Sequence, residues 1–286
     1  MPAPRTLKEA LKRPDHVKWQ EAADLEIQAH LTNGTWEPCK LPAGRRAIPS
    51  KWVLTEKFLP DGTIERYKGR LVVKGCSQRP GFDYLPERTF SPTPRLGSIR
   101  STLARAAIED RALRSVDISH AFINGELEEE IYMQQPEGYH FGAPGDVLRL
   151  KKSLYGLKQA GRVWSQTLHD TLATMGYTCL KSDASFYVFT RGEVQIEIPV
   201  YVDDITISAP TDADADKVVA ELAEYFELRD LGHSSFLLGI QITRDRSKRS
   251  LSLSQRQYII DMLEDYGFSG CTPTCTDSYG AWTSPH

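Results

Sequence analysis

The sequence has no apolar run long enough to cross a membrane. A spanning helix needs about 18 consecutive apolar residues, and no such stretch occurs. The N-terminus begins MPAPRTLK, so it also lacks the apolar core of a secretory signal. We therefore expect no membrane partner and an intracellular, cytoplasmic location.

Cysteine is scarce, with five residues in 286. The number is odd, and Cys39, Cys76 and Cys179 lie far apart, which excludes a simple disulfide framework and favours a reducing compartment. Cys271 and Cys275 could form half of a zinc site, but no second Cys or His pair with matching spacing follows. A structural zinc ion is therefore not expected.

A strong net charge is absent as well, because 35 Lys and Arg oppose 38 Asp and Glu to give −3. This balance argues against indiscriminate nucleic-acid binding. The charges are nevertheless uneven: about 21 basic and about 13 acidic residues precede residue 115, and about 14 and about 25 follow. A protein that holds phosphates with one region and metal ions with another would show this asymmetry, although two ordinary solvated faces would show it too.

The most informative stretch is Tyr201-Val202-Asp203-Asp204 within residues 195–209. Apolar residues occupy every second position on both sides of the acidic pair, which predicts a β-hairpin with Asp203-Asp204 as its two-residue turn. These positions are Ile196, Ile198, Val200 and Val202 before the pair, and Ile205 and Ile207 after it.

Two carboxylates at one turn repel each other, and each raises the pKa of the other unless a cation lies between them. Hard divalent cations such as Mg²⁺ prefer carboxylate oxygens, so the turn could form half of a metal site. Asp is also a common residue of ordinary turns. Asp117, at the end of the apolar run before Ile118, could supply a further ligand, or could simply be a cap or turn residue.

Together these segments resemble the palm of a reverse transcriptase, in which a first strand supplies one catalytic aspartate and a hairpin supplies two more. Further matching segments follow in the same order along the chain. Together they resemble the reverse transcriptase of copia-type LTR retrotransposons, which is part of a Pol polyprotein. The matching segments are Trp36, KWV (51–53), RYKGRLVVKG (66–75), FSP (90–92), AFING (121–125), EEIYM (129–133), QPEG (135–138), KSLYGLKQA (152–160) and FLLGI (236–240).

The resemblance covers roughly residues 30 to 270 and implies an α+β, right-hand polymerase fold. Its fingers and palm would comprise an antiparallel sheet backed by helices, followed by a truncated thumb. We expect an N-terminal helical extension over residues 1–32, the reverse transcriptase domain over 33–270 and a divergent tail over 271–286.

Apolar periodicity and turn residues locate the main elements. They predict helices near 5–31, 98–111, 213–227 and 255–266, another helix that contains Trp164, and a hairpin over 50–75 that turns at Pro60-Asp61-Gly62. The acidic stretch 126–133 fits a solvated helix end. Residues 236–242 and 251–253 fit the two strands of a further hairpin.

The resemblance assigns Asp117, Asp203 and Asp204 as catalytic residues and as ligands of two Mg²⁺ ions, with Mn²⁺ as a substitute. It assigns the remaining candidates to nucleotide binding or to positioning of the primer end. The nucleotide-binding candidates are Lys68, Arg70, Phe122, Tyr155, Gly156, Lys158 and Gln159, and the primer-positioning candidates are Phe236, Leu237, Leu238 and Gly239.

Several of these roles keep an alternative. Lys68 and Arg70 are two residues apart and share a strand face, where they would contact the incoming triphosphate or form an exposed, salt-bridged surface. Phe122 would exclude a ribose 2′-hydroxyl sterically, or would be a core residue of the following helix. Gly156 would let the backbone approach a ligand, whereas Gly161, where the family pattern has Pro, loosens the start of the next helix.

The implied function is RNA-directed DNA synthesis, in which dNTPs are added to a primer 3′-hydroxyl by a two-metal mechanism. The expected partners are an RNA or DNA template with its primer, dNTPs, and other Pol segments such as RNase H and integrase, within a virus-like particle. Two alternatives remain: a decayed fragment that only binds nucleic acid, and an RNA-templated RNA polymerase, against which Phe122 argues.

Overall fold

The structure is a computed structural model that describes residues 3–58 and 63–271. The chain forms two compact units, Met1–His233 and Ser234–His286. In the described part of the chain helices and mostly antiparallel sheets are mixed, so the predicted α+β class is confirmed. No helix in those residues is both long and apolar enough to span a membrane.

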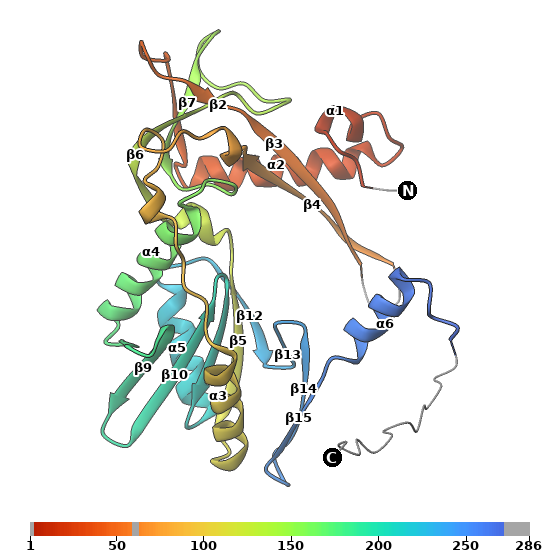
Figure 1. Ribbon diagram of the computed structural model, residues 1–286, viewed down its shortest axis with the longest axis vertical. Coiled ribbons are helices and arrows are strands. Elements are labelled where there is room, and N and C mark those ends of the chain that lie inside the picture. Colours follow the sequence, from red (N-terminus) through yellow and green to blue (C-terminus); the bar gives the residue numbers. More distant parts are fainter. Residues whose placement is uncertain (1–2, 59–62, 272–286) are drawn as a thin grey trace, which may run out of the picture. The chain divides into compact units, whose positions relative to one another are not determined.

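A six-stranded antiparallel sheet in the first unit carries the candidate acidic residues (Figure 1). Its strand order is β12-β5-β11-β10-β9-β8 among the described residues, so β5 lies beside the hairpin β10–β11 although it is far away in sequence. The strands are β5 (Ala112–Ile118), β8 (Thr178–Leu180), β9 (Asp183–Arg191), β10 (Val194–Tyr201), β11 (Asp204–Ala209) and β12 (Leu228–His233).

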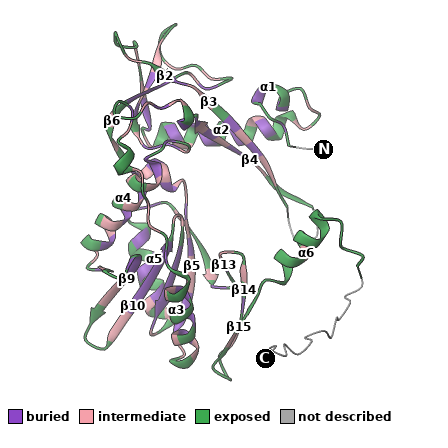
Figure 2. Cartoon of the chain, viewed as in Figure 1, coloured by how far each residue is buried: buried purple, intermediate pink, exposed green. Residues whose placement is uncertain are grey.

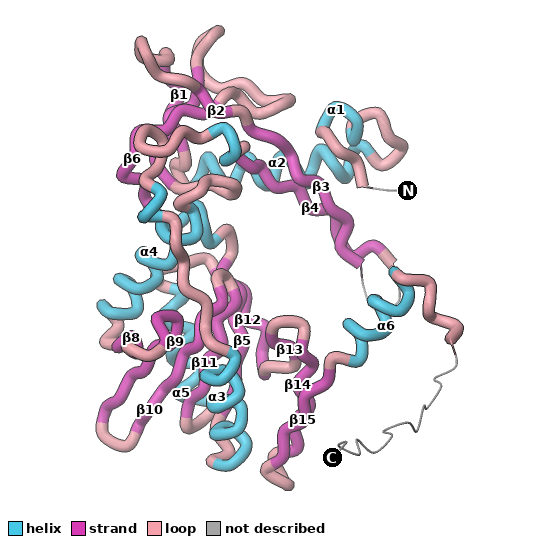
Figure 3. The backbone as a smooth tube through the Cα atoms, viewed as in Figure 1, coloured by secondary structure: helices cyan, strands magenta, loops and turns pink. Residues whose placement is uncertain are grey.

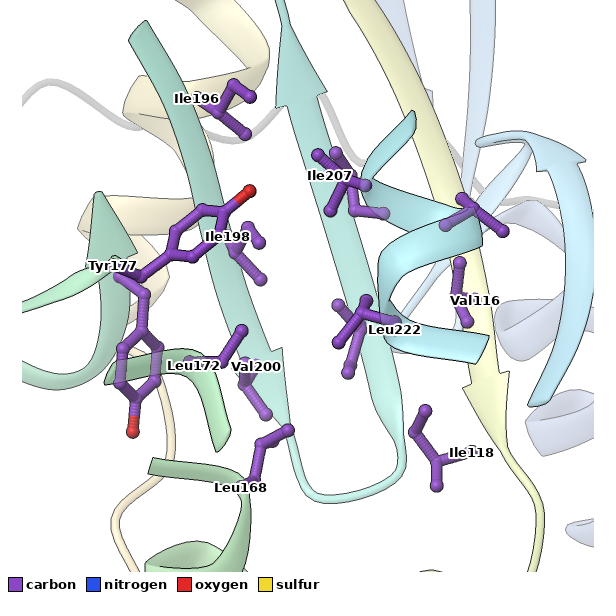
Figure 4. Close-up of a cluster of buried hydrophobic side chains, with 14 of the residues drawn as sticks. Val116, Ile118, Leu168, Leu172, Tyr177, Ile196, Ile198, Val200, Ile207 and Leu222 are labelled. Carbon is purple, nitrogen blue, oxygen red and sulfur yellow. The ribbon is translucent and has the colours of Figure 1, made fainter. Parts of the chain in front are cut away.

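Helices cover this sheet and create the core that holds the hairpin in place. Side chains from the middle strands pack with helices α4 (Ala160–Thr174) and α5 (Asp212–Ala223) in one buried apolar cluster, shown in Figure 4. The neighbouring position Glu197 is also buried and meets α3 (Leu96–Ile108), where Thr102 Oγ1 donates a 3.2 Å hydrogen bond and Arg105 forms an ion pair. Strand β10 is thus covered on both sides.

A second apolar cluster in the same unit packs helices against a smaller sheet and a long hairpin. Helix α2 (His16–Thr32) lies against β4, and Trp19 meets Tyr67 edge-on with 4.6 Å between ring centroids. Figure 3 shows β3 and β4 running side by side as an extended ribbon. The remaining elements are α1 (Leu7–Ala10), β1 (Trp36–Cys39), β2 (Ala47–Ile48), β3 (Ser50–Phe58), β4 (Ile64–Val73), η1 (Gly75–Ser77), η2 (Pro86–Arg88), η3 (Ala121–Asn124), β6 (Glu126–Met133) and β7 (Val147–Lys152).

The second unit contains β13 (Phe236–Leu237), β14 (Ile240–Asp245), β15 (Ser250–Ser254) and helix α6 (Arg256–Asp265). The strands pair in the order β13-β14-β15 within the described residues. Helix α6 carries no buried residue, and Figure 2 shows it exposed along its length. The expected tail over 271–286 lies outside the described residues except for Cys271.

Most predicted helices and strands are present, and three local expectations are wrong. The turn of the acidic hairpin is Val202-Asp203, because Asp204 already pairs with Tyr201 as the first residue of β11. Residues 126–133 form strand β6 and not a helix end. The stretch 236–242 is divided by a turn at Leu238-Gly239, where both residues have positive φ. The predicted turn at Pro60-Asp61-Gly62 lies outside the described residues.

Candidate active site

Strand register brings the predicted aspartates together. Asp117 on β5 and Asp204 on β11 are directly opposed in the antiparallel pair, which implies a Cα separation of roughly 4.5–5.5 Å. Asp203 is adjacent in the turn, and its carbonyl accepts a 3.0 Å hydrogen bond from the Ile118 amide. Three carboxylates therefore emerge at one end of two neighbouring strands.

The turn that carries Asp203 has an unusual backbone. Val202 adopts φ +59°, a left-handed value that is rare for a β-branched residue. Trp164 on α4 donates a 2.7 Å hydrogen bond from Nε1 to the Val202 carbonyl, and the same indole packs edge-on against Phe226 at 5.2 Å. The helix thus holds the hairpin tip in a conformation that the local sequence does not favour.

The ionised forms of Asp117 and Asp204 are disfavoured. Burial, followed by the neighbouring negative charge of Asp203, raises the pKa of the Asp117 carboxyl, while Lys68, Arg229 and Arg66 act in the opposite direction. Burial and then the charges of Asp203 and Asp117 raise the pKa of Asp204. A cation between these carboxylates would relieve the repulsion.

The donor set fits a hard divalent cation in chemistry, because carboxylate oxygens are the ligands that Mg²⁺ prefers. No three Asp, Glu, His or Cys side chains within residues 3–58 and 63–271 already surround one point. The support for metal binding is therefore the backbone placement of Asp117, Asp203 and Asp204 and their mutual repulsion.

A cavity of about 280 Å³ lies beside the aspartates in the first unit. Five of the predicted site residues line it, and they join an acidic edge to a basic wall. These residues are Asp117, Asp203, Lys68, Arg70 and Tyr155. Lys68 and Arg70, on strand β4 of the hairpin, form what we call the basic wall. Asp117 and Asp203, on the six-stranded sheet and its hairpin turn, form the acidic edge.

The basic wall concentrates positive charge. Burial, and then the neighbouring Arg70 and Arg66, lower the pKa of the Lys68 ammonium, and the attraction of Asp117 partly offsets this effect. Such a group gains from an anion that enters the cavity, because the anion compensates for lost solvation and for like-charge repulsion. The wall is suited to phosphate oxygens.

Two aromatic rings connect this wall with the loop after β5. The Arg70 guanidinium lies over the Tyr155 ring, 5.3 Å from its centroid, and Tyr155 meets Phe122 edge-on at 4.8 Å. Burial is the main reason that the pKa of Tyr155 rises to about 12, so its hydroxyl stays protonated at neutral pH. Phe122 lies in η3, a short 3-10 helix, half-buried between the two apolar clusters.

The pattern of strand, acidic hairpin and basic wall is accompanied by a family match. A family model described as reverse transcriptase (RNA-dependent DNA polymerase) matches residues 33–279. The chain belongs to this reverse transcriptase family. The resemblance predicted from the sequence motifs is therefore confirmed.

Similar proteins are Pol polyproteins of plant transposons. The reverse transcriptase domain is 38% identical over 279 residues to the retrovirus-related Pol polyprotein from transposon TNT 1-94 of Nicotiana tabacum, covering 97% of this chain. It is also 38% identical over 275 residues to the corresponding protein from transposon RE1 of Arabidopsis thaliana, covering 96% of this chain. The chain spans 21% and 18% of these relatives, about a fifth of their length.

A solved structure of a foamy viral protease-reverse transcriptase in complex with double-stranded DNA shows a distant likeness. Its sequence identity to this chain is 14% and its TM-score is 0.43, with 86% of this chain and 36% of that chain covered.

The loop before α4 contributes less to the cavity of the reverse transcriptase domain than predicted. Gly156 has φ +91°, and a Cβ there would lie 2.1 Å from the Val73 carbonyl oxygen, so its close approach is to the chain's own backbone. Lys158 is exposed and does not line the cavity. Gln159 is buried and donates a 3.0 Å hydrogen bond to the Asp83 carbonyl, which ties together two loops.

The other predicted residues are distributed as follows. Asp204 and Phe122 adjoin the cavity through Asp117 and Tyr155 without lining it themselves. Residues 236–239 belong to the second unit, so they are not placed relative to the aspartates. Gly161 is the second residue of α4, and a Cβ there would lie 3.1 Å from Ser91 Cβ.

Among the cavity residues that were not predicted from the sequence, four are acidic, basic or histidine side chains: Glu26, Arg66, His120 and Arg229. Glu26 occupies the buried face of α2 with Trp19, Ala23 and Ile27. An acidic residue at a core position of a helix is a signal that the sequence offered for it. His120 follows Asp117 by three residues, but nothing in the sequence indicates its left-handed backbone, φ +51°.

Proposed function

We propose that this domain catalyses RNA-directed DNA synthesis by adding deoxynucleotides to a primer 3′-hydroxyl. The observation that carries this proposal is the direct pairing of Asp117 with Asp204 beside Asp203, at the edge of a cavity with a basic opposite wall. The family match supports the reaction class.

In this proposal the aspartates are the metal-binding residues. Asp117 and Asp203 would hold two Mg²⁺ ions, with Asp204 as a weaker ligand, and Mn²⁺ could substitute. When bound, such ions stabilise charge on both the attacking and the leaving oxygens of an in-line displacement. The protein's own contribution would be to hold Asp203 on a turn anchored by Trp164, next to Asp117 and Asp204, which are paired across two strands.

The basic wall would bind the triphosphate of the incoming nucleotide. Lys68 and Arg70 face the same cavity as Asp117 and Asp203, so phosphates bound to them would lie next to the aspartates. Positioning and charge neutralisation supply most of the catalysis in phosphoryl transfer. Phe122 and Tyr155 would pack against the sugar, where a bulky ring disfavours a 2′-hydroxyl.

The remaining assignments extend the proposal to the rest of the chain. The hairpin β3–β4 would act as fingers and the six-stranded sheet as palm, with residues 236–239 contacting the primer end and α6 beginning a thumb. The loop with Gly156, Lys158 and Gln159 would support the template side. The proposed partners are a primed RNA or DNA template, dNTPs and other segments of a Pol polyprotein, in the cytoplasm.

A primer-extension assay on poly(rA)–oligo(dT) with Mg²⁺ or Mn²⁺ tests the function. The wild-type domain should extend the primer with dTTP, and Asp203→Asn should reduce the rate by about 10²-fold or more. Glu193→Gln is the matched control, because Glu193 is exposed at the opposite end of β10. If the wild-type domain binds the primer and template but adds no nucleotide with either metal ion, the result would favour an inactive chain that only binds nucleic acid.

A further inference from the structure

A buried carboxylate of helix α2 reaches the candidate active-site cavity. Glu26 is only 4% exposed, yet it lines the cavity with Asp117 and Lys68. A buried charge requires compensating partners. Glu26 accepts a 3.0 Å hydrogen bond from the Leu71 amide of β4, and His30 Nε2 lies 3.5 Å away.

The third partner of Glu26 is His120, in the loop that follows Asp117. His120 Nδ1 lies 3.6 Å from Glu26 Oε2, within ion-pair range. The imidazole is one-third exposed and lines the same cavity. Glu26 therefore links helix α2, strand β4 and the loop after β5 at one point.

This arrangement directs one nitrogen of the imidazole toward Glu26. A carboxylate 3.6 Å from Nδ1 favours one orientation of the ring and leaves Nε2 as the other polar atom, and among the described residues no hydrogen-bond partner of Nε2 is present. The backbone of His120 is left-handed, with φ +51°, a conformation that costs energy in residues with a Cβ. Lys68, Arg66 and Arg70 line the same space, so an anionic ligand is the complementary occupant.

We propose that His120, held by Glu26, is a binding residue for the triphosphate of the incoming nucleotide. The ring would donate from Nε2 to a phosphate oxygen while Nδ1 remains directed at Glu26, as a protonated imidazole can. Glu26 acts through His120 and is a positioning residue. This inference rests on the proposed polymerase function and adds two residues that the sequence motifs did not indicate.

The test measures nucleotide binding without chemistry. A poly(rA)–oligo(dT) duplex ending in dideoxythymidine cannot be extended, so dTTP binding appears as stabilisation of the protein–duplex complex. His120→Asn suits this test because Asn tolerates a left-handed backbone and lacks the reach of imidazole. We expect it to raise the Kd for dTTP about tenfold, as the loss of a charge-assisted hydrogen bond implies, with duplex affinity unchanged.

Two further variants distinguish the effect of the Glu26–His120 contact from a general loss of structure. Glu26→Gln retains an acceptor for the Leu71 amide and removes the charge that orients His120, so we expect a smaller increase in the same Kd, about threefold. His140→Asn is the matched control, because His140 is exposed and does not line the cavity, and its Kd for dTTP should match that of the wild type. On an extendable primer, His120→Asn should raise KM for dTTP more than it lowers kcat.

The outcomes distinguish this inference from the proposed function. If wild type extends primers and His120→Asn binds dTTP as tightly as wild type, the role of His120 is refuted while the polymerase stands. Equal losses of dTTP and duplex binding in His120→Asn would indicate a structural role and would also refute it. If wild type neither binds dTTP in the terminated complex nor extends primers, both proposals fail.

Discussion

Asp117 and Asp204 are direct partners across the antiparallel strands β5 and β11. This pairing joins two segments that are more than 80 residues apart in the sequence. Their side chains are not equivalent, because Asp117 lines the cavity with Asp203 whereas Asp204 does not.

The first prediction follows from that asymmetry. Asp117→Asn should reduce primer extension by about 10²-fold or more, whereas Asp204→Asn should leave measurable activity, about 10-fold below wild type, as expected for a weaker metal ligand. Steady-state extension at saturating Mg²⁺ measures both variants. Equal losses at the two positions would contradict the assignment of Asp204 as the lesser ligand.

The second prediction concerns the basic wall. Lys68→Ala should raise KM for dTTP about tenfold, because the variant removes a positive charge that faces Asp117 and would face the triphosphate. Lys57→Ala is the control, since Lys57 is exposed on the same hairpin and does not line the cavity. A KM that changes equally in both variants would mean that the hairpin acts only through its overall charge.

The third prediction tests Phe122 as a sugar-discriminating residue. Phe122→Val should raise the ratio of kcat/KM for UTP to kcat/KM for dTTP about 10- to 100-fold, because a smaller side chain admits the 2′-hydroxyl. Phe141→Val offers a comparison, since Phe141 is also half-buried but packs against Trp36. An unchanged ratio in Phe122→Val would leave this residue with only its packing role.

The sequence allowed the sheet and its acidic edge to be predicted, because the decisive signal was local. Period-two apolar spacing in 195–209 indicated the hairpin, and Asp117 ended another apolar run. The turn was misplaced by one residue because Val is a poor turn former, and the hydrogen bond from Trp164 to the Val202 carbonyl cannot be read from the neighbouring residues. Leu238, with φ +52°, hid a turn in the same way.

Other features depended on tertiary contacts and could not be predicted. Strand β6 exposes its acidic first half and buries Ile131, Tyr132 and Met133, so its charges suggested a solvated helix end. The Glu26–His120 link joins residues 94 positions apart, and nothing near either residue indicates it. Gly156 was expected to let the backbone approach a ligand; the structure shows its close approach to the Val73 carbonyl, and the approach to a ligand stays a prediction.

The fourth prediction concerns the anchor of the hairpin tip. Trp164→Phe keeps the aromatic packing and removes the donor to the Val202 carbonyl, so it should destabilise the fold by about 1 kcal/mol and lower kcat several-fold by loosening Asp203. Tyr187→Phe is the control, because Tyr187 belongs to the same apolar cluster and the variant removes a 3.4 Å contact with His169 instead of a contact with the turn. If the two variants lose kcat equally for similar loss of stability, the indole has no special effect on Asp203.

The last prediction is a pH dependence of stability at Asp183, a carboxylate that is only 4% exposed. Burial acts to raise the pKa of this group, but hydrogen bonds from the Ser98 hydroxyl at 2.6 Å and the Arg95 and Ser185 amides outweigh it and hold the pKa below its usual 3.8. A depressed folded-state pKa stabilises the fold above the unfolded pKa, and this contribution disappears as pH falls through the folded value. Asp183→Asn should therefore lower the free energy of unfolding by about 1–2 kcal/mol at pH 7, and the difference from wild type should shrink below pH 3.8. Urea unfolding at neutral and acidic pH measures this, and a difference that stays constant across the range would show that the charge of Asp183 contributes nothing.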